Sequence, residues 1–130
     1  MDRYVKGASA ERELRKLIED SGFVVVRSAK SGVDGVSPDL LALKTTGRLA
    51  LECKAWKGGL HFSNDKYEIM KEWERKSGVP FYIAWKLTRK GWRFFPLSVL
   101  NKNEQGYSLT IRDFDGGLTV EDVLGISTRT

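Results

Sequence analysis

The spacing of apolar residues near the start of the chain predicts an amphipathic helix, because the residues recur at the interval of one helical face. Its apolar stripe consists of Ala10, Leu14, Leu17 and Ile18. Ser9 is the expected N-cap of this helix, and Gly22 is its expected C-terminal stop. Each residue turns a helix by about 100°, so Glu11 lies about 20° from Ile18. We therefore expect the Glu11 side chain at the border of the stripe, where it can point towards a sheet.

Runs of β-branched and other apolar residues predict strands after this helix. The segment 23–29 is apolar on both faces until its last residues, which is typical of a buried strand. A second helix is expected from Asn64 or Asp65 to Ser77. Further expected elements are strands at 40–45, 48–54, 80–87, 92–96 and 107–111 and a short helix at 119–124. Together these elements indicate an α/β fold in which helices flank a central mixed sheet.

A turn at Thr46-Gly47 is predicted to join two of these strands into a hairpin. If these two residues form the loop, Asp39 pairs with Lys54 at the far end of the hairpin. Side chains alternate along a strand, so Asp39, Glu52 and Lys54 are expected on one face. Glu52 then lies on the diagonal from Asp39, roughly 7–8 Å away at the backbone.

Two carboxylates and an ammonium group on one sheet face suggest a metal-dependent hydrolytic site. Isolated charged residues at strand ends are more often merely solvated, and that interpretation stays open for Asp39 and Glu52 taken singly. As a pair, however, their oxygen atoms with added water suit Mg²⁺. Such an ion lowers the pKa of water and stabilises charge on a phosphoryl oxygen. A neighbouring Lys54 can orient or deprotonate that water, or hold the phosphate.

The charge balance favours a polyanionic partner, although the imbalance is modest. The 130 residues carry 22 Lys and Arg against 17 Asp and Glu, a formal net charge of +5. This length predicts a single domain over residues 1–130. A single Cys excludes an internal disulfide, and no apolar run is long enough to suggest a membrane span, so we expect a cytoplasmic protein. No phosphate-binding Gly-Lys-Ser/Thr loop occurs, so no nucleotide cofactor is expected.

Five ordered segments resemble the signature of archaeal Holliday junction resolvases, a family in the PD-(D/E)xK nuclease superfamily. The segments are Lys6-Gly7-x-x-x-Glu11-Arg12, Val26-Arg27-Ser28-Ala29, Pro38-Asp39, Glu52-x-Lys54 and Gly91-Trp92-Arg93-Phe94-Phe95-Pro96. The resemblance extends over roughly residues 4–124. A Pro-Asp followed by Glu-x-Lys is a weak signal alone, but the ordered set is specific.

The resemblance implies a homodimeric endonuclease of DNA recombination and repair with a restriction-endonuclease-like fold. It implies paired, symmetric cleavage of four-way junction DNA, with Mg²⁺ as the cofactor and Mn²⁺ as an alternative ion. Asp39 and Glu52 would be metal ligands, Glu11 a further acidic residue at the metal, and Lys54 the residue that assists the attacking water. The residues implied to contact DNA are Arg12, Arg27, Ser28 and Lys30.

Two other functions are compatible with the same residues. One is a different PD-(D/E)xK DNA nuclease of the restriction or repair type. The other is a non-catalytic DNA-binding module that keeps only the fold. The lone His61 is expected to be a surface or packing residue and is given no role in the chemistry.

Aromatic residues are unusually dense in the region of the two later strands. They are Phe81, Tyr82, Trp85, Trp92, Phe94 and Phe95. This density exceeds what a small core requires, and aromatic side chains concentrate in protein interfaces. Part of this set is therefore expected at a dimer surface.

Overall fold

The computed structural model describes residues 3–28 and 36–125. The helices are α1 (Arg3–Asp20), α2 (Asn64–Ser77) and α3 (Val120–Leu124), with two 3₁₀ helices, η1 (Leu97–Val99) and η2 (Ile111–Gly116). The strands are β1 (Val24–Arg27), β2 (Leu40–Lys44), β3 (Gly47–Lys54), β4 (Leu60–Phe62), β5 (Phe81–Leu87), β6 (Gly91–Pro96), β7 (Asn101–Asn103) and β8 (Gly106–Leu109). None of the helices in these two ranges is both long and apolar enough to cross a membrane.

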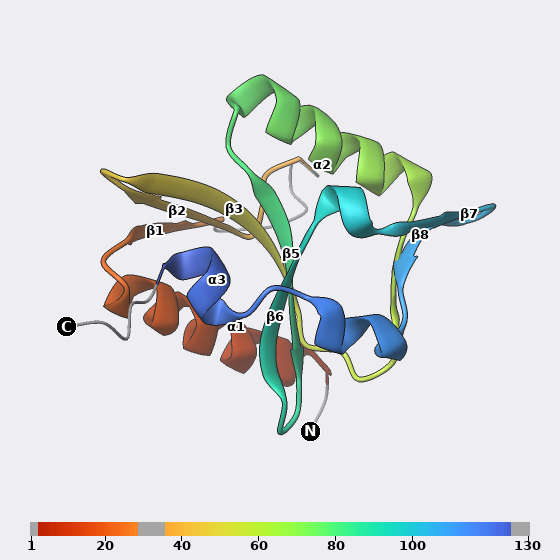
Figure 1. The fold of residues 1–130 in the computed structure, drawn as a ribbon, viewed down its shortest axis with the longest axis horizontal. Coiled ribbons are helices and arrows are strands. Elements are labelled where there is room, and N and C mark those ends of the chain that lie inside the picture. Colours follow the sequence, from red (N-terminus) through yellow and green to blue (C-terminus); the bar gives the residue numbers. More distant parts are fainter. Residues whose placement is uncertain (1–2, 29–35, 126–130) are drawn as a thin grey trace.

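A five-stranded sheet with the order β1-β2-β3-β5-β6 forms the centre of the molecule. Strands β3 and β5 are parallel, and the other neighbours in this sheet are antiparallel. A parallel pair needs a crossover connection, and α2 lies in the connection between β3 and β5. Helices α1 and α2 lie on opposite sides of the sheet (Figure 1). The predicted mixed sheet with flanking helices is therefore confirmed.

A second, three-stranded sheet with the order β4-β8-β7 was not predicted as a sheet. Only β8 corresponds to a strand expected from the sequence. Strands β4 and β7 contain three residues each, and β7 is exposed throughout. Segments this short cannot show the sustained alternation of apolar and polar residues that identifies a strand in a sequence.

Helix α1 starts earlier than predicted, so Ser9 lies inside the helix and is not its N-cap. The preceding residues contain no Pro, and one Gly costs only about 1 kcal/mol in a helix, which is too little to end it. The predicted C-terminal stop is confirmed, because Gly22, two residues after the end of α1, has a φ of 96°. The predicted stripe is also confirmed, since Ala10, Leu14 and Ile18 are buried.

Strand β1 was predicted to be buried on both faces, and this prediction is wrong. It lies at the edge of the sheet and pairs with β2 alone. Val24 is 67% exposed and Val26 is 51% exposed. The sequence shows that these residues are apolar, but it does not show that α2 leaves this part of the sheet uncovered.

The hairpin of β2 and β3 has a register that differs by two residues from the predicted one. Lys44 pairs with Gly47, so the loop consists of Thr45 and Thr46. Gly47 does not have a positive φ and is the first residue of β3, not part of the turn. Extending the register by one step places Asp39 beside Glu52 rather than Lys54. A shift of two residues keeps every side chain on its predicted face.

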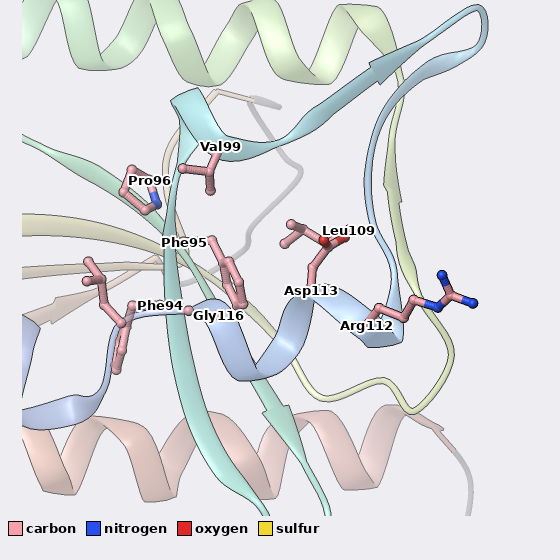
Figure 2. Close-up of a pocket in the computed structure, with 10 residues that line it drawn as sticks. Phe94, Phe95, Pro96, Val99, Leu109, Arg112, Asp113 and Gly116 are labelled. Atoms are coloured by element: carbon pink, nitrogen blue, oxygen red, sulfur yellow. The ribbon is translucent and has the colours of Figure 1, made fainter.

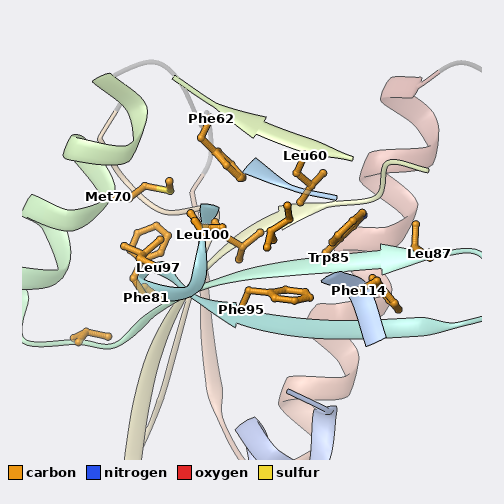
Figure 3. Close-up of a cluster of buried hydrophobic side chains, with 14 residues drawn as sticks. Leu60, Phe62, Met70, Phe81, Trp85, Leu87, Phe95, Leu97, Leu100 and Phe114 are labelled. Atoms are coloured by element: carbon orange, nitrogen blue, oxygen red, sulfur yellow. The ribbon is translucent and has the colours of Figure 1, made fainter. Parts of the chain in front are cut away.

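Two apolar cores lie on the two sides of the large sheet. One core, in which β5 packs against α2 and the smaller sheet, contains Phe81, Trp85 and Phe95 (Figure 3). The other core contains Trp92 and Phe94 with the apolar stripe of α1. These five aromatic residues are each at most 5% exposed. They belong to the cores, and the prediction that this set contributes to a dimer surface is wrong for all five.

Candidate active site

The hairpin brings two carboxylates together where β2 begins and β3 approaches its end. Asp39 directly precedes β2, and its Oδ2 accepts a hydrogen bond of 2.8 Å from the backbone N–H of Cys53. Glu52 lies one residue before Cys53 in β3 and is only 6% exposed. Among the described residues, Glu52 is the one charged residue that is buried to this extent. The ends of β2 and β3 therefore hold a carboxylate pair in which Glu52 is buried and Asp39 is partly buried.

Burial raises the pKa of both carboxyl groups. For Glu52 the next largest cause is repulsion from Asp39, which raises the pKa further. For Asp39 the hydrogen bond from Cys53 acts against burial, while the negative charge of Glu11 adds to it. The positive charges of Lys54 and Lys66 lower both pKa values. Both shifts are upward chiefly because burial disfavours the charged form of each carboxyl group.

Lys54 ends β3 on the same face as Glu52, two residues further along the strand. It lines a cavity of about 440 Å³ together with Gly7 of α1, Trp56 and His61. Its Nζ lies 5.7 Å from the ring centroid of Phe62, which helps to hold the side chain in place. The ammonium group is thus positioned between the carboxylate pair and an open cavity.

The Glu11 side chain is only 19% exposed. This agrees with its predicted position at the border of the apolar stripe of the helix. Its Oε1 accepts a hydrogen bond from Nε of Arg27 on β1, so the two residues form an ion pair between α1 and the sheet. The backbone N–H of Ser28 donates to the carbonyl oxygen of Asp39 at 3.0 Å. Arg12 is exposed on the next position of α1. Lys30 lies outside the described residues.

The chemistry of the carboxylate pair fits a divalent metal ion. Two neighbouring carboxylates, supplemented by water, form a donor set that Mg²⁺ accepts. In residues 3–28 and 36–125, no group of three or more His, Cys, Asp or Glu side chains is arranged to hold an ion. Glu11 acts electrostatically on Asp39, but its carboxylate is paired with Arg27. Asp39 and Glu52 are therefore the residues that could hold a metal in this arrangement.

Two residues at the site were missed or set aside in the sequence analysis. His61 was given no role, but it lines the same cavity as Lys54. Lys66 of α2 was given no role, because acidic residues balance the basic residues of that helix, yet its Nζ lies 3.3 Å from Oε2 of Glu52. The sequence shows both as polar residues after β3, but only the fold brings His61 of β4 to the cavity of Lys54 and Lys66 of α2 to Glu52.

A second cavity, of about 390 Å³, lies on β6 and η2 and contains none of the predicted site residues (Figure 2). Phe94, Phe95 and Leu109 contribute apolar side chains to it, and Arg112 and Asp113 provide polar groups. Three carboxylates and several cations meet at the ends of β2 and β3. The second cavity is lined by one carboxylate, that of Asp113, and one cation, that of Arg112. The chemistry therefore favours the hairpin as the active site.

Comparison with known proteins identifies the class of fold. The solved structure of Archaeoglobus fulgidus Hjc, a Holliday junction resolvase, matches with a TM-score of 0.84 and 31% identity. The match covers 95% of this chain and 99% of that chain. The mixed sheet and its flanking helices thus form a nuclease fold.

Sequence comparison then gives the family. Residues 2–130 match the model of the archaeal Holliday junction resolvase family, and the chain belongs to this family. The crossover junction endodeoxyribonuclease Hjc of Archaeoglobus fulgidus is 35% identical over 122 residues, which cover 92% of this chain and 90% of the relative. The protein of the same name from Sulfurisphaera tokodaii is 30% identical over 125 residues, covering 92% of this chain and 85% of the relative.

Proposed function

We propose that this protein is a divalent-metal-dependent endodeoxyribonuclease that resolves four-way DNA junctions by paired, symmetric strand cleavage. The observation that carries the proposal is the pair of Asp39 and the buried Glu52 beside Lys54, in a chain of the archaeal resolvase family. Hydrolysis of a phosphodiester requires a hydroxide, neutralisation of the developing charge and stabilisation of the leaving oxygen. Carboxylates that hold a metal, with an adjacent ammonium group, meet these requirements without a covalent intermediate.

Asp39 and Glu52 would hold the ion, which we propose to be Mg²⁺, with Mn²⁺ as a substitute. When bound, such an ion provides positive charge for the transition state and makes hydroxide accessible near neutral pH. The hydrogen bond from Cys53 fixes one oxygen of Asp39, and the carboxylate would bind the ion in this orientation. Lys54 orients the attacking water and neutralises charge on the phosphate.

The remaining predicted residues act around this centre in the proposal. Arg27 holds the Glu11 carboxylate beside the site, where its charge acts on Asp39. Arg12 is exposed on α1 and would contact a backbone phosphate, as would Ser28 next to Arg27. Such contacts read the shape and charge of DNA, so binding should weaken steeply as salt is added.

A homodimer would provide the two equivalent sites that paired cleavage of one junction requires. We propose that its surface lies on the side of the sheet that faces α2. Val26 pairs with Leu41, which packs against the core beneath α2, so Val26 and Val24 lie on this side of the sheet. Both valines are exposed. Ile69 and Trp73 of α2 line a largely apolar cavity of about 550 Å³. Exposed apolar patches of this kind commonly mark interfaces. We further propose that the protein acts in the cytoplasm, where archaeal DNA is located.

A side-by-side cleavage assay tests the proposed activity. Synthetic four-way junction, flap and plain duplex DNA are incubated with the wild type and with Glu52→Gln, with and without Mg²⁺. The proposal predicts paired nicks at symmetric positions in the junction only when the wild type and Mg²⁺ are both present. Equal or faster cleavage of duplex or flap DNA would instead indicate a restriction-type or repair nuclease. Absence of any cleavage with Mg²⁺ or Mn²⁺ would contradict enzymatic function.

A further inference from the structure

Lys66 connects the helix α2 to the candidate active site. Its Nζ lies 3.3 Å from Oε2 of Glu52, and the Glu52 side chain is only 9% exposed in this pair. The backbone of Lys66 is fixed, because its N–H donates a 3.0 Å hydrogen bond to Oγ of Ser63, the N-cap of α2. The Lys66 side chain is 32% exposed, so its ammonium group can also reach solvent. One end of this side chain is therefore anchored, and its charged end is directed at a buried carboxylate.

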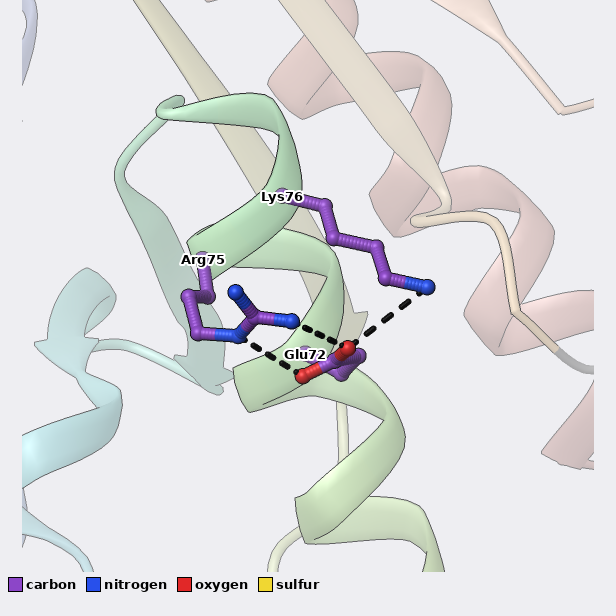
Figure 4. A network of polar contacts seen from close by, with 3 residues as sticks. All are labelled: Glu72, Arg75 and Lys76. Carbon is purple, nitrogen blue, oxygen red and sulfur yellow. Dashed lines mark hydrogen bonds and ion pairs between the residues drawn. The ribbon is translucent and has the colours of Figure 1, made fainter.

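The other basic residues of α2 form ion pairs within the helix. Lys71 pairs with Glu74 at 3.9 Å, and Arg75 and Lys76 both pair with Glu72, at 2.6 and 3.5 Å (Figure 4). These pairs are exposed, and they involve residues three or four positions apart on one helix. Among the described ion pairs of α2, the pair of Lys66 is the one that crosses to the sheet. Its role is therefore tied to Glu52 and not to the surface of the helix.

Lys66 forms an ion pair with Glu52, which is one of the two carboxylates that would bind the proposed metal ion. The three carboxylates near the site are Glu11, Asp39 and Glu52, and Arg27 already pairs with the first of them. Lys66 acts on the remaining two, and its contact with Glu52 is direct. A divalent ion between Asp39 and Glu52 must displace this ammonium group from Oε2 or share the carboxylate with it. Either case involves repulsion between two positive charges.

We propose that Lys66 is a positioning residue that sets the affinity of the Asp39–Glu52 pair for its divalent ion. Without metal, its ammonium group lies 3.3 Å from Oε2 of Glu52 and orients this carboxylate. As the ion binds, Lys66 leaves Oε2, and the free energy of this displacement weakens metal binding. The inference depends on the proposed function, because it assumes that this carboxylate pair is the metal site.

The expected effect of removing the Lys66 charge is tighter metal binding. A unit positive charge about 6 Å from a divalent ion, screened by solvent to an effective dielectric constant of about 80, opposes binding by about tenfold. Lys66→Met keeps the length and apolar stem of the side chain and removes its charge. Lys71→Met makes the same chemical change on the same helix, but at an ion pair that does not involve the site. It therefore serves as the matched control.

Titration of each protein with Mn²⁺ in the absence of DNA, followed by calorimetry at pH 8, measures this effect without any catalytic readout. Lys66→Met is expected to bind Mn²⁺ about tenfold more tightly than the wild type, and Lys71→Met is expected to bind like the wild type. Thermal unfolding in EDTA establishes that each variant is folded. If Lys66→Met does not fold, Lys66→Gln replaces it, with the same expected direction.

Equal or weaker Mn²⁺ binding by a folded Lys66 variant would overturn the inference. That result, accompanied by lower stability in EDTA, would assign Lys66 a purely structural role as a counter-ion. The proposed function would survive it, because the wild type would still bind metal. Absence of Mn²⁺ binding by all the proteins would instead overturn the proposed metal site itself.

Discussion

Replacing Glu52 by Gln should stabilise the metal-free protein while it abolishes cleavage. Glu52 is buried, and both burial and the charge of Asp39 raise its pKa, so the folded protein disfavours its ionised form. At a separation of about 5 Å and an effective dielectric constant of about 20, two carboxylates repel one another by about 3 kcal/mol. Gln removes this repulsion but also removes the attraction to Lys66 and Lys54. Because the net shift of the Glu52 pKa is upward, we expect a net gain in stability, and single substitutions typically change stability by about 1 kcal/mol.

The sign of the pH dependence follows from the same shift. A carboxyl group whose pKa is raised on folding binds more protons in the native state than in the unfolded state. The stability of the wild type therefore falls as pH rises from the ordinary pKa of Glu through its raised value. The advantage of Glu52→Gln should be present at pH 8 and absent at pH 4, where the wild-type carboxyl group is protonated.

Urea or thermal unfolding in EDTA at both pH values measures this prediction. At pH 8 the melting temperature of Glu52→Gln should exceed that of the wild type by about 3–5 °C. Saturating Mn²⁺ should stabilise the wild type more than the variant and reduce or reverse this difference. Glu104→Gln, at an exposed position, should change stability by less than about 0.5 kcal/mol. A Glu52→Gln protein that is less stable than the wild type at pH 8 in EDTA would refute the reasoning.

Three further predictions concern catalysis, assembly and folding. Lys54→Ala should reduce junction cleavage by about 10²–10⁴-fold while junction binding in EDTA, measured by gel shift, stays within a few fold; unchanged cleavage would remove Lys54 from the mechanism. Val24→Glu should convert the dimer to a monomer in size-exclusion chromatography with light scattering and should abolish the pairing of cuts. Val99→Glu, also at an exposed position, should do neither. A dimeric Val24→Glu protein would contradict the proposed surface. Gly117→Ala should destabilise the protein by about 1–3 kcal/mol, because its Cβ would lie 2.5 Å from Cζ of Phe95, while Gly116→Ala has open space; equal urea midpoints for the two variants would refute this packing argument.

The sequence predicted the face of each hairpin residue but not the register of the hairpin. A period of two fixes which side of the sheet Asp39, Glu52 and Lys54 occupy, and a shift of two residues leaves that unchanged. The register itself depends on which residues form the turn. Gly47 was assigned to the loop because Gly supplies a positive φ in tight hairpin turns, but here it belongs to β3. The predicted neighbour of Asp39 was therefore Lys54, and the structure indicates Glu52.

Long-range contacts account for what the sequence did not reveal about the site. Lys66 follows Glu52 by fourteen positions and reaches it only because α2 crosses over the sheet between two parallel strands. Its local surroundings, a helix with balanced charges, indicated an ordinary solvated lysine. Likewise, the exposure of Val24 and Val26 depends on where α2 lies and not on their own sequence. Local periodicity predicts which residues form an element, but the positions of other elements decide which of those residues become a site or an exposed surface.

Crystals grown with Mn²⁺ test the central claim most directly, because the anomalous scattering of the ion locates it independently of any activity. The account predicts an anomalous peak bound by carboxylate oxygens of both Asp39 and Glu52, and no such peak in crystals of Glu52→Gln. A peak elsewhere in the wild type, or no bound ion at a concentration that supports cleavage, would contradict the claim that this carboxylate pair holds the metal.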